Sequence, residues 1–237
     1  MIIAVAQIKL SVKIEENLRK VIRFSKKASR QKVNILCFPE CALTGYIRNF
    51  RNLDLREIEK SLDRLQDFAE KEKMNLIIGT HLKKGSKLFN CGVVLLKDGK
   101  KFIYRKQNLT EFDKKFFSPG KENLIFRING TRYGVAICRD QNYSEIFQDY
   151  KKRGVKMVFL LSAHYYPLRE AKLKIDKNKA LPIVRALDSR IFIAKADAVG
   201  KVKNKRSYGG SIIVDPKGVA MKEAKPGRES ILTAKVT

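Results

Sequence analysis

Residues 133–140 read Tyr-Gly-Val-Ala-Ile-Cys-Arg-Asp, an apolar run that ends in a cysteine and is followed at once by charged residues. This pattern predicts a buried strand that delivers the Cys138 thiol to its carboxyl end. A thiol in that position can act as a nucleophile, but cysteine is also among the most buried residue types. Cys138 could therefore be a catalytic nucleophile or a residue of the core. The first interpretation requires a base and an oxyanion stabiliser elsewhere in the chain.

The same order of predicted elements occurs twice along the chain, with almost no residue identity between the two copies. In the first half, strand, helix, strand, helix, strand, strand are predicted at residues 2–8, 15–31, 33–38, 54–69, 76–79 and 91–96. In the second half, the same order is predicted at residues 133–137, 142–154, 156–161, 181–189, 191–194 and 211–214. Asp54 and Asn142, each followed three residues later by glutamate, are the predicted helix caps. Pro182 is expected in the first turn of its helix.

Each half supplies a sheet with helices on one face only, so neither half covers its sheet alone. Two such units would bury their open faces against each other. The sequence therefore predicts the α/β class, as a four-layer αββα sandwich with an internal pseudo-two-fold repeat. We expect a single domain over residues 1–237, joined in the middle by a long, charged connection at residues 97–124.

The bulk composition limits the class of protein. The chain has 237 residues, 44% of them hydrophobic, which is enough for a large core. Four scattered cysteines and two histidines argue against a zinc site and for reduced thiols in a cytoplasmic protein. The apolar run at residues 2–8 is too short for a signal peptide and no later run could span a bilayer, so we expect no membrane association.

The net charge of +27 is large, but the 51 lysine and arginine residues are spread along the whole chain. This distribution favours a solvated basic surface that binds nucleic acid only non-specifically at low salt. A dedicated polyanion-binding or nucleic-acid-binding protein stays open as an alternative function.

Three types of side chain, glutamate, lysine and histidine, could act in catalysis together with Cys138. Glu40 follows the apolar run that ends in Phe38-Pro39, where partial desolvation would suit a carboxylate to proton transfer, although a loop acid is an equal alternative. Lys106 lies in the connection and carries no signal by itself. His81 and His164 each follow an apolar run, so a cysteine–histidine arrangement is a further alternative.

Taken together and in order, these motifs resemble the nitrilase (carbon-nitrogen hydrolase) superfamily. The matching segments are Phe38-Pro39-Glu40, Asn90, Tyr104-Arg105-Lys106, Phe117-x-Pro119-Gly120, Gly134 to Cys138 with Asp140, Arg185-Ala186 and Gly210 to Gly218. They run from residue 2 to about residue 220. The αββα fold with internal pseudo-symmetry that is known for this superfamily agrees with the repeat described above.

The resemblance implies a catalytic centre of Glu40, Lys106 and Cys138, with no metal and no cofactor. It further implies hydrolysis of a non-peptide carbon–nitrogen bond in a small amide through a cysteine thioester, and a homodimer or higher homo-oligomer. Acyl transfer and nitrile hydrolysis are alternatives within the family.

Three positions depart from the family pattern, and one of them is Asn108, which stands where the family frequently has a histidine. The family's second glutamate is replaced by Asp113, with Glu111 two residues earlier, so either could support the centre. The residue after the nucleophile is Arg139. It could bind the carboxylate of an anionic substrate, or face solvent, or pair with Asp140 or Glu145.

Overall fold

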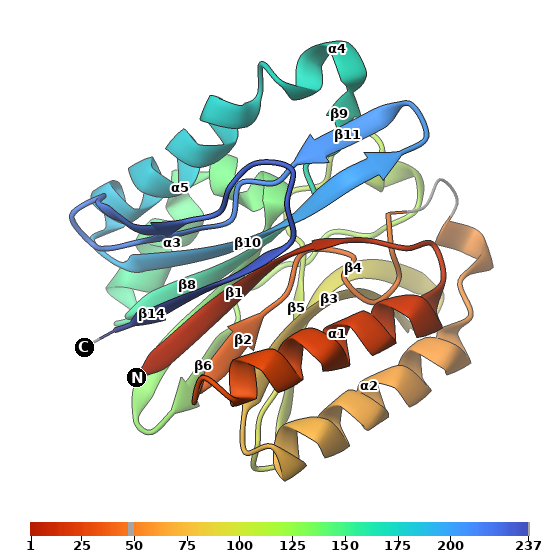
Figure 1. Ribbon diagram of the computed structural model, residues 1–237, viewed down its shortest axis with the longest axis horizontal. Coiled ribbons are helices and arrows are strands. Elements are labelled where there is room, and N and C mark those ends of the chain that lie inside the picture. Colours follow the sequence, from red (N-terminus) through yellow and green to blue (C-terminus); the bar gives the residue numbers. More distant parts are fainter. Residues whose placement is uncertain (47–49, 237) are drawn as a thin grey trace.

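The computed structural model describes residues 1–46 and 50–236, and every helix and strand predicted above is present (Figure 1). The strands predicted at 76–79 and 191–194 continue to Lys84 and Val202, and the helix predicted at 181–189 begins at Ile175. The strands are β1 (Ile2–Lys9), β2 (Ile35–Cys37), β3 (Asn75–Lys84), β4 (Lys87–Leu95), β5 (Lys101–Arg105), β6 (Ile125–Ile128), β7 (Thr131–Ile137), β8 (Met157–Ser162), β9 (Tyr166–Pro167), β10 (Phe192–Val202), β11 (Lys205–Tyr208), β12 (Ile212–Val214), β13 (Ala220–Glu223) and β14 (Ser230–Lys235). The helices are α1 (Ile14–Ser29), α2 (Leu55–Lys71), α3 (Ser144–Lys152), α4 (Leu168–Ala171) and α5 (Ile175–Ser189), with 3-10 turns η1 (Phe50–Asn52), η2 (Asp113–Lys115) and η3 (Cys138–Asn142). Of the helices in this described part, none is both long and apolar enough to cross a bilayer.

The first half of the chain forms a sheet in the order β5-β4-β3-β2-β1, in which β1, β2 and β3 are parallel. Helices α1 and α2 cover its outer face (Figure 1). They bury apolar rows that recur at helical spacing, such as Leu18 and Val21 on α1 and Leu62 and Leu65 on α2. The predicted cap of α2 is present, because Asp54 accepts a hydrogen bond of 2.9 Å from the backbone nitrogen of Glu57.

The second half repeats this arrangement. Strands β10, β8 and β7 are parallel, with β6 antiparallel beside β7 and β12 antiparallel beside β10. Helices α3 and α5 pack on the outer face through a cluster that includes Phe147, Tyr150 and Ala186.

The two inner sheet faces pack against each other. Val5 and Ile77 of the first half share a buried cluster with Val135 and Phe159 of the second. Both faces of these strands are therefore covered, which explains why they appear in the sequence as continuous apolar runs and not as alternating ones. The predicted four-layer αββα sandwich with its internal repeat is confirmed.

The two sheets are joined at one corner into a continuous hydrogen-bonded network. Here Ile8 and Lys9 of β1 pair in parallel with Ala198 and Val199 of β10. Strand β14, which the sequence analysis did not predict, runs antiparallel to β1 along its length, from Lys235 opposite Ile2 to Ser230 opposite Gln7. Its residues, Ser-Ile-Leu-Thr-Ala-Lys, form neither a continuous apolar run nor a strict alternation, so neither strand pattern marks them.

Two local predictions were wrong. Helix α3 begins at Ser144 after Tyr143, which makes no side-chain cap, because Asn142 is still part of the η3 turn. Helix α5 begins at Ile175, so Pro182 lies inside it and not in its first turn. Proline lacks the N–H that would bond to the carbonyl four residues earlier, and that carbonyl, of Asn178, instead accepts a hydrogen bond of 2.7 Å from Lys195 Nζ.

Candidate active site

The candidate catalytic residues gather where parallel strands end. Glu40 follows β2, Cys138 follows β7 directly, and Lys106 follows β5. The carboxyl ends of parallel strands meet at one edge of a sheet, and ligands of α/β proteins bind in the crevice outside that edge. The sandwich brings the edges of its two sheets together, so residues from both halves of the chain share one site.

Lys106 lies at the centre of a buried ionic cluster. Its Nζ atom is 2.8 Å from Glu40 Oε1 and 2.8 Å from Asp113 Oδ2, and the lysine is 2% exposed. Asn90 also donates a hydrogen bond of 2.8 Å to Glu40 Oε1. An ammonium group has three N–H donors, and the two carboxylates occupy two of them. One donor of Lys106 is left for another acceptor.

Charge pairing keeps this lysine protonated. Burial by itself lowers the pKa of Lys106, but the negative charges of Glu40, Cys138 and Asp113 more than reverse this, so its pKa is raised well above its usual value. The site therefore holds a fixed positive charge in a sheltered environment, where a cation interacts strongly with developing negative charge.

Asp113, and not Glu111, supports this cluster. Besides Lys106, Asp113 Oδ2 accepts a hydrogen bond of 3.0 Å from the backbone nitrogen of Thr110. Burial favours the neutral form of Asp113, but the adjacent Lys106 holds the pKa of the carboxyl below its usual range. The Glu111 side chain is 81% exposed and pairs with Lys114 at the surface. Of the two acids that the sequence left open, Asp113 is therefore the one that contacts Lys106.

The cysteine backbone has an unusual conformation. Cys138 has a φ of 47°, in the left-handed region that non-glycine residues rarely adopt. Such strain is common at functional sites. Burial, together with the Glu40 carboxylate, raises the pKa of the Cys138 thiol, and Lys106 partly opposes this. A proton acceptor is therefore needed to form the thiolate at neutral pH.

Asp140 stabilises the turn that contains Cys138 by accepting hydrogen bonds through both of its carboxylate oxygens. Its Oδ2 accepts hydrogen bonds from the Ile137 backbone nitrogen (2.9 Å) and from the Tyr104 hydroxyl (2.8 Å). Its Oδ1 accepts from the Asn108 backbone nitrogen at 2.9 Å. Since Tyr104 and Asn108 lie on either side of Lys106 in sequence, Asp140 connects the cysteine turn to the lysine segment.

Two glycines permit the close approach of these segments. A Cβ atom on Gly79 of β3 would lie 2.1 Å from the carbonyl oxygen of Pro39, next to Glu40. A Cβ atom on Gly120 would lie 2.1 Å from the carbonyl oxygen of Arg105, next to Lys106. Any other residue at either position would displace one of the two charged groups.

A cavity of about 190 Å³ opens beside Cys138. Its lining consists of Tyr46, Thr110, Cys138, Arg139, Gln141, Asn142, Ala163, His164, Tyr165, Tyr166, Lys177, Asn178 and Leu181. Pockets for drug-sized ligands span roughly 300–1,000 Å³, so this cavity suits a small acyl group.

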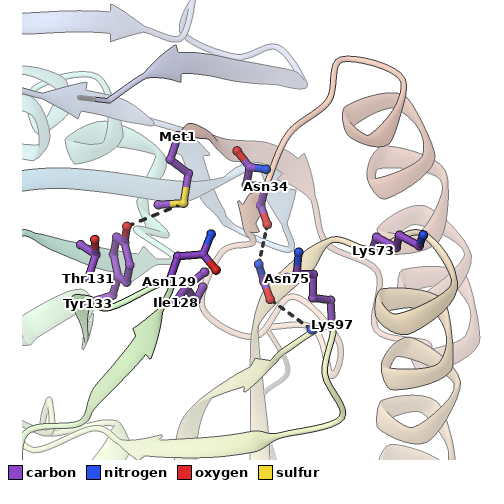
Figure 2. A pocket seen from close by; sticks show the side chains of 9 residues that line it. All are labelled: Met1, Asn34, Lys73, Asn75, Lys97, Ile128, Asn129, Thr131 and Tyr133. Carbon is purple, nitrogen blue, oxygen red and sulfur yellow. Dashed lines mark hydrogen bonds between the residues drawn. The ribbon is translucent and has the colours of Figure 1, made fainter.

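A second depression, of about 280 Å³, lies at the opposite ends of the strands, around Met1, Asn34 and Asn75 (Figure 2). Figure 2 shows Asn75 bridging its neighbours: its Nδ2 donates to the Asn34 carbonyl (2.8 Å) and its Oδ1 accepts from the Lys97 backbone nitrogen (3.1 Å). The described residues that line it include no thiol, carboxylate or imidazole side chain. Of these two cavities, the one at Cys138 is the one whose described lining includes a thiol.

The two histidines have different surroundings, and no described contact joins either to the Cys138 thiol. His81 is buried, with Nδ1 2.7 Å from Thr44 Oγ1 and Nε2 3.7 Å from the Cys41 sulfur. Burial lowers the pKa of His81 to about 3, so it is neutral. His164 lines the cavity, but its nitrogens contact Asp197 Oδ2 (2.9 Å) and Gln141 Nε2 (3.1 Å).

Arg139 makes neither of the ion pairs considered for it. Among the described residues, no salt bridge joins it to Asp140 or Glu145, and its buried Nε atom has no hydrogen-bond partner. The side chain lines the cavity beside Cys138. Within the same described part of the chain, no three histidine, cysteine or acidic side chains are grouped as metal ligands.

The sequence pattern of the carbon-nitrogen hydrolase family matches residues 2–237, and the chain belongs to this family. Two similar proteins are a 2-oxoglutaramate amidase from Bacillus subtilis and a nitrilase from Pyrococcus abyssi. The first is 27% identical over 92% of this chain and 82% of its own length. The second is 29% identical over 94% of this chain and 84% of its own length.

A solved structure has the same fold. An amidase from Nesterenkonia sp. AN1 superimposes with a TM-score of 0.90 over 100% of this chain and 93% of its own, at 20% identity. In another structure of that amidase, acrylamide has added to the active-site cysteine.

Proposed function

We propose that this enzyme is a thiol amidohydrolase in which Cys138 attacks the carbonyl carbon of a small amide. The observation that carries the proposal is the position of Lys106 Nζ, 2.8 Å from both Glu40 Oε1 and Asp113 Oδ2, with one donor left over. A base, a fixed cation and a thiol at a small cavity are the parts that acyl transfer from an amide requires. The amidases among the similar proteins support this reaction class.

In the first half-reaction, the Glu40 carboxylate takes the proton of the Cys138 thiol while the sulfur bonds to the amide carbon. The oxyanion that forms accepts hydrogen bonds from the free donor of Lys106 and from the backbone N–H of Arg139, which lies in the first turn after the strand. Glu40 then gives its proton to the departing nitrogen. The carbon–nitrogen bond breaks, ammonia or an amine leaves, and a thioester remains.

In the second half-reaction, Glu40 takes a proton from water, whose oxygen bonds to the thioester carbon. The same two donors hold the second oxyanion. The carbon–sulfur bond breaks, the carboxylic acid leaves, and the thiolate recovers its proton from Glu40. Asp113 touches no reacting atom in this scheme and acts by positioning Lys106.

We also propose that the chain works as a single domain over residues 1–237, in the cytoplasm and as a homodimer. These expectations rest on the sequence and on the family.

The test is release of ammonia from a panel of small aliphatic amides. We expect Cys138→Ala to abolish release and Glu40→Gln to reduce it by more than about 100-fold while the protein stays folded, since general base catalysis contributes roughly 10²–10⁴-fold. Glu59→Gln, at an exposed position of α2, is the matched control. Release that survives in Cys138→Ala would contradict the mechanism. An amide product in the presence of an added amine would indicate acyl transfer.

A further inference from the structure

A buried ion pair lies behind the wall of the cavity at Cys138, and the proposed mechanism does not use it. Lys195 and Asp197 of β10 are both 0% exposed, and Lys195 Nζ is 3.2 Å from Asp197 Oδ2. Since they are two residues apart on one strand, they share the outer face of the sheet with Ile193, which packs in the cluster beneath α5. Replacing a buried ion pair by apolar residues is often neutral or stabilising, so this pair calls for a reason other than stability.

Asp197 holds one part of the cavity wall, the segment that follows β8. Its Oδ2 lies 2.9 Å from His164 Nδ1, and its Oδ1 accepts a hydrogen bond of 3.3 Å from the His164 backbone nitrogen. A carboxylate only accepts hydrogen bonds, so His164 Nδ1 carries a hydrogen whether the ring is neutral or charged. Asp197 therefore fixes both the backbone and the ring of His164, which lines the cavity.

Lys195 holds another part of the wall, the first turn of α5. Its Nζ donates a hydrogen bond of 2.7 Å to the backbone carbonyl of Asn178. That carbonyl is available because Pro182, four residues later in the helix, has no N–H to donate to it. Asn178 also lines the cavity, and its Oδ1 accepts a hydrogen bond of 3.0 Å from the hydroxyl of Tyr166. Lys195 thus ties the start of α5 to β10.

The same network reaches the turn that contains the nucleophile. Gln141 Nε2 is 3.1 Å from His164 Nε2, and Gln141 belongs to η3, the 3-10 turn that begins at Cys138. Four residues of the cavity lining therefore belong to the network: Gln141, His164, Tyr166 and Asn178. The ion pair behind them joins three segments of the chain, which are η3, the residues after β8 and the start of α5.

We propose that Lys195 and Asp197 are positioning residues, which hold the wall of the cavity against the acyl group that Cys138 receives. This inference rests on the proposed function, because it concerns the same reaction. Neither side chain touches a reacting atom in that scheme, and both act through the lining residues that they contact. An uncharged pair in their place would remove the cost of burying charge, but it would not hold α5, because no other side chain replaces the donor to the Asn178 carbonyl.

The test uses two amides that differ in the length of the acyl group, acetamide and butanamide. The measured quantity is the ratio of their kcat/KM values, butanamide over acetamide. A smaller fraction of folded enzyme lowers both values alike and leaves the ratio as it is, so the ratio separates positioning from stability. The longer acyl group extends further along the cavity wall, and a displaced wall therefore lowers the kcat/KM of butanamide more than that of acetamide.

The first variant combines Lys195→Met with Asp197→Asn, so that no buried charge is left without its partner. We expect it to lower the ratio by at least about tenfold, the discrimination that one methylene contact in a pocket provides. Leu65→Ala is the control, because it removes buried apolar contacts on α2, in the opposite outer layer. It should destabilise the protein and leave the ratio as it is.

Pro182→Ala tests the same wall without removing a charge. Alanine supplies the missing N–H, which competes with Lys195 for the Asn178 carbonyl, so the ratio should fall although alanine favours the helix. A folded double variant that keeps the ratio of the unmodified enzyme would overturn the inference. If the double variant does not fold, an unchanged ratio in Pro182→Ala would overturn it. An unmodified enzyme that hydrolyses neither amide would instead contradict the proposed function.

Discussion

Lys106 Nζ lies 2.8 Å from Asp113 Oδ2, and this buried ion pair fixes the lysine beside Glu40. We propose that Asp113 positions Lys106, because its other described hydrogen bonds are with Thr110 in the preceding loop. We expect Asp113→Asn to lower kcat by about 10- to 100-fold with a smaller change in KM, in line with the loss of a hydrogen bond to a charged group. Steady-state kinetics with any amide that the enzyme hydrolyses would show it.

Glu111→Gln is the matched control for that measurement. Its side chain pairs only with Lys114 at the surface, and surface pairs contribute little, so kcat should stay within about twofold. Equal losses in the two variants would argue that Asp113 has no special role.

The hydroxyl of Tyr104 donates to Asp140 and so helps to hold the cysteine turn. We expect Tyr104→Phe to reduce the free energy of unfolding by about 1–3 kcal/mol, because it leaves a buried acceptor without one partner. Tyr133→Phe is the control, since that hydroxyl makes a long contact of 3.7 Å with the Met1 sulfur and none with Asp140 among the described hydrogen bonds. Denaturant unfolding of the two variants gives the comparison, and equal costs would speak against the anchoring role of Asp140.

Lys195 and Asp197 should be strongly coupled. Either Lys195→Met or Asp197→Asn leaves one buried charge without its partner, which typically costs about 3–5 kcal/mol. The double variant should lose less than the sum of the single losses, because neither charge remains. A double-mutant cycle on the free energy of unfolding measures the coupling, and simple additivity would show that the two charges do not stabilise each other.

Acid should destabilise the protein through its buried aspartates. Burial alone would raise the pKa of Asp197, but Lys195 and His164 more than offset this, and its pKa is lowered, as is that of Asp113. A lowered folded-state pKa contributes stability that is complete above the unfolded value, about 4, and is lost as the pH falls below it. Urea unfolding at pH 6, 4 and 3 should show this decline, with a shallower slope in the Lys195→Met, Asp197→Asn double variant.

The net charge of +27 predicts weak binding to polyanions that does not involve the cavity. Affinity for duplex DNA should fall steeply with salt and be the same in Cys138→Ala, since only counterion release drives it. Filter binding at several salt concentrations measures the slope. Tight binding that persists at physiological salt would instead favour the nucleic-acid-binding alternative.

The layered fold could be predicted from the sequence because its strands are buried on both faces and its helices on one. A strand buried on both faces gives a continuous apolar run, as in the runs that end at Cys37 and Ile137. A helix buried on one face gives apolar residues at helical spacing, so both kinds of element can be predicted from the order of apolar residues. Strand β14 could not be predicted in the same way, because its six residues form no continuous apolar run and no strict alternation, and its partner β1 is more than 220 residues earlier.

Glu40 and Lys106, which the resemblance implied for the catalytic centre, are in contact, and Asp113 joins them, although no single motif in the sequence was persuasive. The role of Asp113 over Glu111 depends on which carboxylate reaches Lys106, a distance that sequence spacing does not contain. Lys195 and Asp197 were missed. Two opposite charges two residues apart on the same face of an otherwise apolar strand were a visible signal.

The proposed mechanism requires that Cys138 carry the acyl group of the substrate as a thioester. Rapid acid quench during turnover of an amide, followed by mass spectrometry of the digested protein, measures it most directly. We expect a peptide containing Cys138 that is heavier by the acyl group in place of one hydrogen, and no such adduct in Cys138→Ala. An enzyme that turns over amide while no acyl adduct forms, or forms one on Cys41 instead, would contradict it.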